Sequence, residues 1–500
     1  MIIRSSVGKA LILALCSVAF SSCSQGGSSS SGGGSGSQQA GTPQIDWNGN
    51  TERQLREAIA QAPANGLKPE LFLKGGEKGA ALTEAALKYA SALANGYSDP
   101  SKLHEVYTIA RSRIDPRQGL AEAIQKGDVK GWFDTLVPQT DEYRALSQAH
   151  LHYLQLAAKG QPQPIPDGKP IKAGKSDPRI ALVRAALVAS EIVAARTPPA
   201  QKAGATTAAH AAPAAQSNRY SPDLVAAVKR VQAEWGFKPD GVIGGDTLNA
   251  LNAGPSYRAR QLAIAMERLR WLQRSPPATR IDVNTAASLL DYWRGGEHAD
   301  HREVVEGEPD KPTPQLQGPI TRLVAKPTWR VPKGIGEKEL ATKSQSWLQA
   351  NGFVLQGDQW IQQSGPKNSL GLVKFDMQDP EQIYLHDTPA KALFGLPERH
   401  RSHGCVHVQN AVEFATSLAQ EQGILDRFQQ AMQKDDESFV PLKTPIPVRL
   451  LYQTAFWDGS RIQFRPDVYG WDDNVAKALG LEPGPPRKIP QPESSDDVGP

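Results

Sequence analysis

The residues with the most reactive chemistry in this chain are His403, Gly404 and Cys405, which are consecutive. Cys405 is the only cysteine after residue 23 among 500 residues. If the triplet is extended, the period of two along a strand places the imidazole and the thiol on one face. An imidazole beside a thiol favours the nucleophilic thiolate, and Gly404, which has no side chain, lets a substrate backbone come close. We therefore expect His403 to ionise Cys405 for nucleophilic attack.

Three segments around this triplet resemble those of a known family. Residues 402–406, SHGCV, resemble the S-H-G-C-[IV]-R signature of bacterial L,D-transpeptidases. Residues 384–389, YLHDTP, resemble that family's second histidine segment at a matching distance, and residues 365–375, GPKNSLGLVKF, match its G-P-x-N-[AS]-L-G-x-V-K-F segment. The family usually has arginine after the C-[IV] pair, whereas this chain has His407, so a constant charge becomes a titratable one.

The resemblance implies acyl transfer on the stem peptides of peptidoglycan. Cys405 would attack the carbonyl of the third residue of a tetrapeptide stem, expel D-alanine and form a thioacyl enzyme. An amine of a neighbouring stem would then join two third-position residues. His403 would take the thiol proton and return one to the leaving amine, and either Ser402 or a backbone carbonyl would orient it. Such an acyltransferase would serve cell wall biogenesis and cell shape.

The remaining site residues receive narrower roles. The tetrahedral oxyanion needs hydrogen-bond donors, and the amides of Gly404 and Cys405 and the His386 side chain are candidates. His407 is either neutral and structural or charged near the substrate carboxylate. Asn368 either caps its turn or contacts substrate, and the turn is favoured.

A zinc site is the alternative use of these histidines. The chain has ten histidines, and His400, His403, Cys405 and His407 have a spacing that allows metal ligation. No second cysteine pair accompanies them, and the segment matches a metal-free family. We therefore expect no metal and no cofactor, with His400 as a solvated loop residue.

The N-terminus is typical of an exported protein. Arg4 and Lys9 precede an apolar run, residues 10–20, that is too short for a transmembrane helix. Two serines then precede Cys23 in a pattern that resembles a bacterial lipobox, so we expect residues 1–23 to be a signal peptide and Cys23 to be lipidated. An ordinary signal peptide with an incidental cysteine is the alternative. Residue 24 is not the aspartate retention signal, which favours a periplasmic lipoprotein of the outer membrane.

The sequence predicts a multidomain α+β chain. A flexible Ser/Gly linker, residues 24–43, should lead to a helical scaffold over 44–160, whose helices include one at 102–112. We expect a small three-helix domain at 177–255 with a disordered insert at 197–218. A mostly β catalytic domain should follow at 278–454, with a cap at 336–363 that contains one helix, 337–350. Residues 411–432 should be helical, 455–482 a C-terminal extension and 483–500 a disordered tail.

The three-helix domain carries a polymer-binding pattern. Leu224, Val228, Val231 and Trp235 form one apolar helical stripe. Residues 240–252, DGVIGGDTLNALN, resemble the ending of peptidoglycan-binding helical domains. Such a domain would raise the local concentration of enzyme on its polymer, although the pattern also suits a plain helical core. The formal net charge of +4 predicts no strong field for nucleic acid.

Two other functions share these residues. A cysteine carboxypeptidase or hydrolase would use water in place of the acceptor amine, and members of the family also attach or release proteins at the same stem position. A non-catalytic wall-binding lipoprotein would result if His407 abolished activity. Analysis of stem-peptide products separates these alternatives from transpeptidation.

Overall fold

The structure is a computed structural model that describes residues 45–192 and 218–485. These residues all belong to one compact unit, Pro43–Pro500. The signal peptide, the lipidation site at Cys23 and the linker lie outside the described residues, as do most of the insert and the tail. Within the described part of the chain, no helix has the length and apolar character needed to cross a membrane.

The N-terminal region is helical, as expected. Several of its helices begin at side chains that accept the first free backbone N–H groups: Asn48 forms a capping box with Thr51, and Thr140 accepts from Tyr143. The apolar faces of α1, α2, α4 and α5 meet in one core that includes Leu55 and Tyr89, whereas Tyr143 and Leu146 of α6 pack in the core of the three-helix segment. The helices are α1 (Gly49–Ala60), α2 (Ala80–Asn95), α3 (Pro100–Leu103), α4 (Arg117–Lys126), α5 (Val129–Leu136) and α6 (Asp141–Ala158), with short 3-10 turns at Ala62–Asn65 and Pro69–Leu71.

The helix expected at 102–112 is wrong. α3 ends at Leu103, and the chain then runs without regular structure, forming isolated bridges between Tyr107 and Gln315 and between Arg111 and Leu272. The Thr108 N–H donates to the Gln315 carbonyl oxygen at 3.2 Å. Backbone pairing to distant residues has therefore overridden a local helical pattern, which is a weak preference in any case.

The three-helix segment comprises α7 (Ile180–Ala189), α8 (Pro222–Glu234) and α9 (Gly245–Asn252). The predicted stripe is buried: Leu224, Val228 and Val231 are 0% exposed. Buried Gln232 holds the glycine-containing loop, because it accepts from the Gly241 N–H at 2.8 Å and donates to Thr247 at 3.0 Å. These contacts give the motif over 240–252 a structural role in holding the loop before α9. α10 (Pro255–Trp271) follows, and its residues are mostly buried.

The C-terminal domain is built on a nine-stranded sheet in the order β10-β3-β11-β9-β8-β4-β12-β1-β2. Because β2 also pairs with β3, the sheet closes on itself like a barrel. Its core is lined by alternate residues of the strands, as the period of two predicts. The strands are β1 (Arg280–Asn284), β2 (Leu289–Arg294), β3 (Glu297–Gly307), β4 (Gln317–Ala325), β8 (Val373–Met377), β9 (Leu385–His386), β10 (His400–Ser402), β11 (Val406–Val408) and β12 (Ser438–Leu451).

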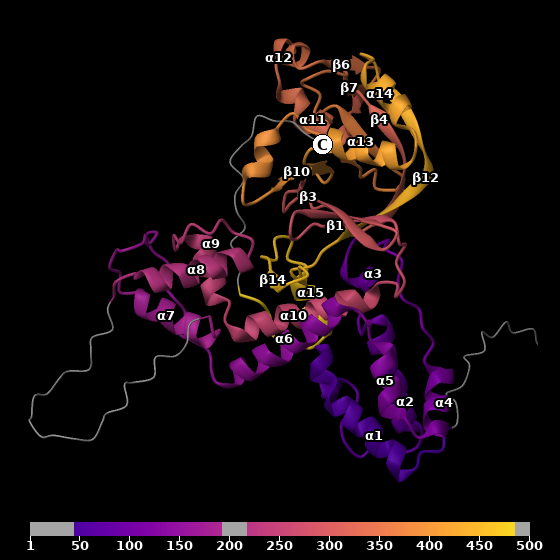
Figure 1. The fold of residues 1–500 in the computed structure, drawn as a ribbon, viewed down its shortest axis with the longest axis vertical. Helices are drawn as coiled ribbons and strands as arrows, with labels where there is room; N and C mark the ends of the chain where they lie inside the picture. Colours follow the sequence, from indigo (N-terminus) through magenta and orange to yellow (C-terminus); the bar gives the residue numbers. More distant parts are fainter. Residues whose placement is uncertain (1–44, 193–217, 486–500) are drawn as a thin grey trace, which may run out of the picture. The chain divides into compact units, whose positions relative to one another are not determined.

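Two helices pack against this sheet beside β4, β8 and β12 (Figure 1). They are α13 (Ala411–Glu421) and α14 (Leu425–Met432), where one continuous helix was expected. Gly423 separates them with a φ of +60°, a conformation that favours glycine and ends a helix. Phe414 of α13 is fully buried, with its ring centroid 5.4 Å from that of Phe375 on β8.

The cap also differs from the single helix expected. It contains α11 (Lys333–Lys338), a 3-10 turn at Leu340–Thr342 and α12 (Gln345–Ala350), which begins at the Ser344 cap. Its small sheet, in the order β5-β7-β6, joins Trp329–Arg330, Gln359–Gln362 and Phe353–Gln356. Because β5 lies before residue 336, the cap extends upstream of the expected boundary. Trp347 and Phe353 stack in its core with ring centroids 5.8 Å apart, which fits a packing role.

The C-terminal extension forms a hairpin, β13 (Ala455–Trp457) and β14 (Ile462–Phe464), followed by α15 (Asp472–Ala478). Phe464 stacks on Trp235 after α8, with ring centroids 5.6 Å apart. Tyr469 donates from its hydroxyl to the Gly307 carbonyl oxygen at 2.8 Å. The extension thus joins the core of the three-helix segment and supports the end of β3. The predicted fold class, a multidomain α+β chain with helical regions and a mostly β domain, is confirmed.

Candidate active site

The two histidine-containing segments lie side by side on neighbouring strands. β9 and β11 pair in parallel, with His386 opposite His407. The Val406 N–H donates to the Tyr384 carbonyl oxygen at 3.1 Å. Backbone hydrogen bonds therefore fix the register of the two segments, and Cys405 lies at the entry of β11.

Residues 402–405 form a turn, whereas the sequence predicted an extended triplet. Gly404 has a φ of +118°, in the region that favours glycine. Its N–H donates to Ser402 Oγ at 3.1 Å, and the Ser402 hydroxyl donates to the Cys405 carbonyl oxygen at 2.6 Å. Ser402 therefore holds the turn and does not orient His403, and the Gly404 amide is already engaged. The Cys405 N–H has no hydrogen-bond partner among the residues described here.

The thiol of Cys405 is buried and protonated. The residue is 7% exposed, and burial raises the thiol pKa to about 11. Hydrogen bonds from the backbone and side chain of Tyr384, together with the charge of Lys374, oppose this rise only in part. Burial therefore opposes the ionisation of the thiol that the sequence predicted from an adjacent imidazole.

His403 is held by a residue of the cap. Its Nε2–H donates to Glu339 Oε1 at 2.6 Å, and its buried Nδ1 has no hydrogen-bond partner within the described part of the chain. Lys311 Nζ lies 3.3 Å from the same Glu339 oxygen and 2.9 Å from Glu308. The imidazole is thus oriented by a carboxylate from the cap, and no hydrogen bond joins it to Cys405 among these described residues.

His386 has the features of a buried neutral base. It is 0% exposed, and burial holds its pKa well below the usual value, with the nearby His407 acting in the same direction. Its Nδ1–H donates to the Asp387 carbonyl oxygen at 2.5 Å, so Nε2 carries a lone pair, and that atom has no hydrogen-bond partner in the described ranges. A neutral imidazole in this tautomer can accept a proton but cannot donate to an oxyanion. The oxyanion role expected for His386 is therefore not supported.

His407 lies inside the domain. It is 4% exposed, and its ring centroid is 4.5 Å from that of His386 in a T-shaped arrangement. β11, which carries it, pairs with β3 as well as β9. This position supports the structural role that the sequence left open and not contact with a substrate carboxylate.

Asn368 shapes the turn before β8. Its side-chain amide donates to the carbonyl oxygens of Gln362 and Gln363 at 3.2 and 2.9 Å, and its Oδ1 accepts from the Leu370 N–H at 2.8 Å. The residue is 1% exposed. Its amide group is thus used within the turn, which is the role that the sequence favoured, and the substrate-binding alternative is not supported.

Residues 278–447, which carry all these groups, match the family described as "L,D-transpeptidase catalytic domain". The chain carries an L,D-transpeptidase domain. The predicted resemblance is confirmed by this match and by two others. Residues 45–149 match the family described as "Scaffold domain", and residues 207–251 match that described as "Putative peptidoglycan binding domain".

A curated relative carries the same family name. A protein of Haemophilus influenzae (strain ATCC 51907 / DSM 11121 / KW20 / Rd), named "Putative L,D-transpeptidase", is 26% identical over 219 residues. The match covers 39% of this chain and 45% of the relative. The chain thus spans less than half the length of the relative in this match.

Solved L,D-transpeptidase structures resemble the chain weakly. One is a carbamoyl enzyme formed by Ldtfm with avibactam, which is 14% identical with a TM-score of 0.20 over 35% of this chain and 49% of that chain. Another is LdtMt1 in complex with imipenem, which is 15% identical with a TM-score of 0.21 over 35% of this chain and 59% of that chain. A third is a cysteine-to-serine mutant of the Enterococcus faecium L,D-transpeptidase, which is 13% identical with a TM-score of 0.19 over 35% of this chain and 50% of that chain.

Behind the cysteine turn, the L,D-transpeptidase domain contains a buried charged histidine. His400 was expected in solvent, but it is 5% exposed on β10. Its Nδ1 lies 2.8 Å from Glu398 Oε1 and its Nε2 lies 2.7 Å from the Thr285 carbonyl oxygen. Since both partners only accept, both ring nitrogens donate and the ring is an imidazolium. The carboxylates of Glu398 and Glu306 raise its pKa against the effect of burial.

Sequence reasoning missed two residues of the L,D-transpeptidase domain. Glu339 belongs to the cap, and no spacing rule connects it with His403, 64 residues later. Lys374 lies opposite His386 across the β8–β9 pair, and its Nζ is 4.0 Å from the centroid of the Tyr384 ring. The alternation of Lys374 and Asp376 with buried residues in a strand was the only available signal, and it indicates a solvated face equally well.

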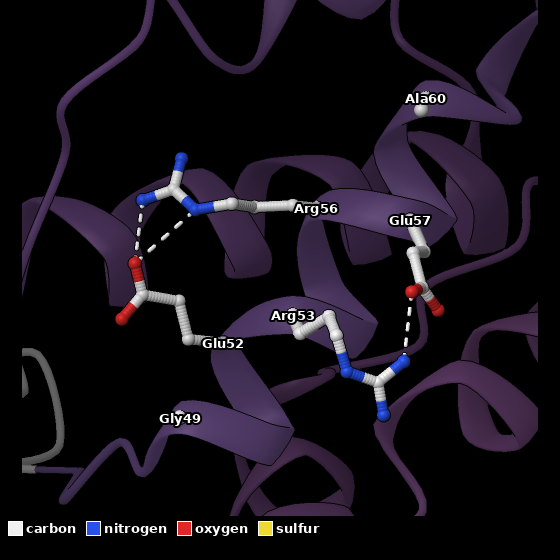
Figure 2. Close-up of a pocket in the computed structure, with 6 residues that line it drawn as sticks. All are labelled: Gly49, Glu52, Arg53, Arg56, Glu57 and Ala60. Atoms are coloured by element: carbon white, nitrogen blue, oxygen red, sulfur yellow. Dashed lines mark hydrogen bonds and ion pairs between the residues drawn. The ribbon is translucent and has the colours of Figure 1, made fainter.

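One surface hollow in the helical region is unrelated to this site. It has a volume of about 490 Å³ and lies along α1. Two ion pairs, Glu52–Arg56 and Arg53–Glu57, line its wall, and each joins residues one helical turn apart (Figure 2). Because these charges neutralise each other on an exposed helix, the hollow is a solvated helix face and not a candidate active site. The remaining lining residues are Gly49 and Ala60.

Proposed function

We propose that this protein is an L,D-transpeptidase that crosslinks peptidoglycan stem peptides through a thioacyl enzyme on Cys405. The observation that carries the proposal is the pairing of β9 with β11, which brings a buried, neutral His386 and the Cys405 turn onto adjacent strands within a matching catalytic domain. The enzyme is a cysteine acyltransferase that uses no cofactor.

His386 is the proposed general base. It shares two neighbours, Lys374 and Tyr384, with Cys405. Its unpartnered Nε2 carries the lone pair that a thiol proton needs, and the Asp387 carbonyl fixes that tautomer. Cys405 is then the nucleophile, His386 the base and the Asp387 carbonyl the third group that orients the base, as in other activated nucleophiles. This assignment replaces the base role that the sequence suggested for His403.

Acylation then proceeds in balanced steps. The Cys405 thiol gives its proton to His386 Nε2, and Sγ bonds to the carbonyl carbon of the third stem residue. The Cys405 N–H, for which residues 45–192 and 218–485 supply no hydrogen-bond partner, is the proposed donor to the oxyanion. The bond to D-alanine breaks as the imidazolium returns its proton to the leaving amine. The thiol proton is therefore released with D-alanine, and the enzyme holds a thioester.

His403 is the proposed proton relay for the acceptor. Glu339 orients its ring from the cap, which leaves Nδ1 to take a proton from the incoming amine. That amine attacks the thioester carbonyl, the C–S bond breaks, and the proton returns to the Cys405 sulfur. Peptide transfer, in place of hydrolysis, then depends on an amine reaching the thioester before water does.

Mass spectrometry tests this proposal. Incubation of purified protein with tetrapeptide-stem muropeptides should give a covalent adduct on Cys405 with loss of D-alanine, and crosslinked third-position products should follow. The matched control is Cys405→Ala, which should yield neither. Tripeptide products without crosslinks would indicate the carboxypeptidase alternative. Absence of any adduct would favour the non-catalytic wall-binding alternative, for which the buried, protonated thiol is the supporting observation.

The proposed location follows from the substrate. Peptidoglycan is supported as the partner by the two matched domains over 207–251 and 278–447. We place the enzyme in the periplasm, anchored to the outer membrane by lipid on Cys23, with no nucleic-acid partner. Incorporation of labelled fatty acid into the wild-type chain but not into Cys23→Ser tests the anchor.

A further inference from the structure

A second group of histidines lies on the β2–β3 hairpin. His298 Nε2 is 2.7 Å from Asp291 Oδ1, and His301 Nδ1 is 2.8 Å from the same oxygen. The ligand-type atoms of the three side chains all lie within 4.8 Å of one another. None of these residues belongs to the cysteine turn or to the proposed proton path.

An irregularity in the strand pairing creates this convergence. His301 pairs with Asp291, whereas His298 pairs with Trp293, and the register shifts between Tyr292 and Trp293. In a regular strand, His298 and His301 would point to opposite faces, because they are an odd number of positions apart. The extra residue of the bulge turns both histidines toward the face that carries Asp291, which is the usual effect of a bulge on side-chain direction.

The neighbouring carboxylates already have cationic partners. On β1, Asp282 accepts from Arg449 at 2.7 and 2.8 Å and from Arg280 at 2.8 Å. On β3, Asp300 accepts from Arg302 at 2.7 and 2.8 Å. Asp291 differs from both, because the two imidazoles are its only side-chain hydrogen-bond partners within residues 45–192 and 218–485. Asp291 is therefore a carboxylate of this hairpin that can be shared with a cation.

The three ligand groups favour a metal ion of borderline hardness, between the hard ions that prefer oxygen and the soft ions that prefer sulfur. Two imidazole nitrogens and one carboxylate oxygen suit Zn²⁺, whereas Ca²⁺ and Mg²⁺ prefer oxygen ligands. A tetrahedral zinc ion with ligand distances of about 2.0–2.2 Å needs its ligand atoms about 3.3 Å apart. The side chains of Asp291, His298 and His301 are 35%, 46% and 50% exposed, so small rotations in solvent reach that spacing without moving the strands.

We propose that Asp291, His298 and His301 form a Zn²⁺ site, with water at the open coordination position. The ion takes Nε2 of His298, Nδ1 of His301 and one carboxylate oxygen of Asp291. The protons on the two bonded nitrogens move to the other ring nitrogens, which are free to face solvent. Since β2 and β3 form the pair that closes the sheet, the ion crosslinks that closure. The site is separate from the residues proposed for acyl transfer.

Titration of the full-length, untagged protein with Zn²⁺ against a chromophoric chelator tests this site. The expected result is one equivalent bound with a micromolar or lower Kd, and a loss of affinity of about tenfold or more in each of Asp291→Asn, His298→Gln and His301→Gln. His152→Gln is the matched control, since His152 is similarly exposed at 47% and lies on α6. Its affinity for Zn²⁺ should equal that of the wild type.

Two further readouts separate ligand loss from misfolding. Zn²⁺ should raise the Tm of the wild type and of His152→Gln but not that of the three site variants, whose circular dichroism should match the wild type. Co²⁺ should give visible absorption bands of a nitrogen- and oxygen-ligated site, and these bands should vanish in His298→Gln. Zinc binding that is absent, or that is unchanged in all three site variants, would overturn the proposal.

Discussion

Glu339 of the cap accepts a hydrogen bond at 2.6 Å from His403, which lies two residues before Cys405 in the same turn. The bond connects the cap directly to the proposed proton path. Lys311 shares the same carboxylate oxygen at 3.3 Å, so the cap contact is a small network of charges and not a single pair.

Glu339→Gln should slow transpeptidation while leaving the fold intact. Glutamine can still accept from His403 Nε2, but the negative charge that supports a protonated ring is lost. A hydrogen bond to a charged group contributes about 1.5–3 kcal/mol, so we expect kcat to fall by about tenfold or more with little change in KM. The measurement is steady-state release of crosslinked product.

The control for this variant is Lys311→Met, which removes the second partner of Glu339 but keeps its bond to His403. Its kcat should fall far less than that of Glu339→Gln. A structural role for Glu339 alone would lower the Tm and leave the ratio of crosslinked to hydrolysed product unchanged. A role in the acceptor half-reaction shifts that ratio toward hydrolysis.

The two histidines should differ in the half-reaction that each supports. His386→Gln removes the proposed base for the thiol, so the rate of acyl-enzyme formation should fall by about a hundredfold or more. His403→Gln should affect acylation much less and deacylation by the amine much more. Single-turnover mass spectrometry with a tetrapeptide donor, with and without acceptor, measures both. The reverse order of effects would restore the base role to His403.

The parts of the site that depend on neighbouring residues were accessible from the sequence. The turn at Asn368 and the apolar stripe of α8 concern groups within a few positions, where side-chain period and turn chemistry apply. The Ser402–Cys405 signature identified the family, but its extended geometry was wrong, because Ser402 closes a turn there. These patterns and the family match led to the correct domain types.

The parts that depend on tertiary packing were not accessible. The contact of Glu339 with His403 crosses from the cap to the turn, and the pKa of the Cys405 thiol depends on burial and on Tyr384 and Lys374, which are distant from it in the sequence. His400 illustrates the same limit, because the local loop pattern gives no sign of its buried partners Glu398 and Thr285. The bulge that joins His298 and His301 also follows from pairing and not from spacing.

Alkylation of Cys405 should follow the titration of a buried thiol in the free protein. Because burial raises its pKa to about 11, the rate of modification by iodoacetamide should keep rising above pH 9. Peptide mass mapping of the segment that contains Cys405 measures the rate at each pH. A plateau already at neutral pH would mean that an imidazole ionises the thiol before substrate binds, as the sequence alone suggested.

Stability should fall as the pH rises through the neutral range, because two groups beneath the cysteine turn hold extra protons in the fold. Burial raises the pKa of Glu306 to about 8, and neighbouring carboxylates raise the pKa of His400 above its usual value. A group whose pKa is higher in the folded state binds more protons in the folded protein than in the unfolded chain. Its contribution to the free energy of unfolding is complete below the pKa of the unfolded state, and it is lost as the pH rises through the pKa of the folded state. For Glu306 the loss runs from about pH 4.5 to about 8, and for His400 it begins near 6.5.

Thermal unfolding at several pH values checks this dependence. The Tm of the wild type should decrease between pH 5.5 and 8.5, with a change of about 2–4 °C for each kcal/mol lost from a domain of this size. Glu306→Gln keeps the neutral form at every pH, so its Tm should decline less over the same range and exceed that of the wild type at pH 8.5. An unchanged pH slope in Glu306→Gln would show that Glu306 is already ionised in the fold, and the loss of stability would then have to come from other groups such as His400.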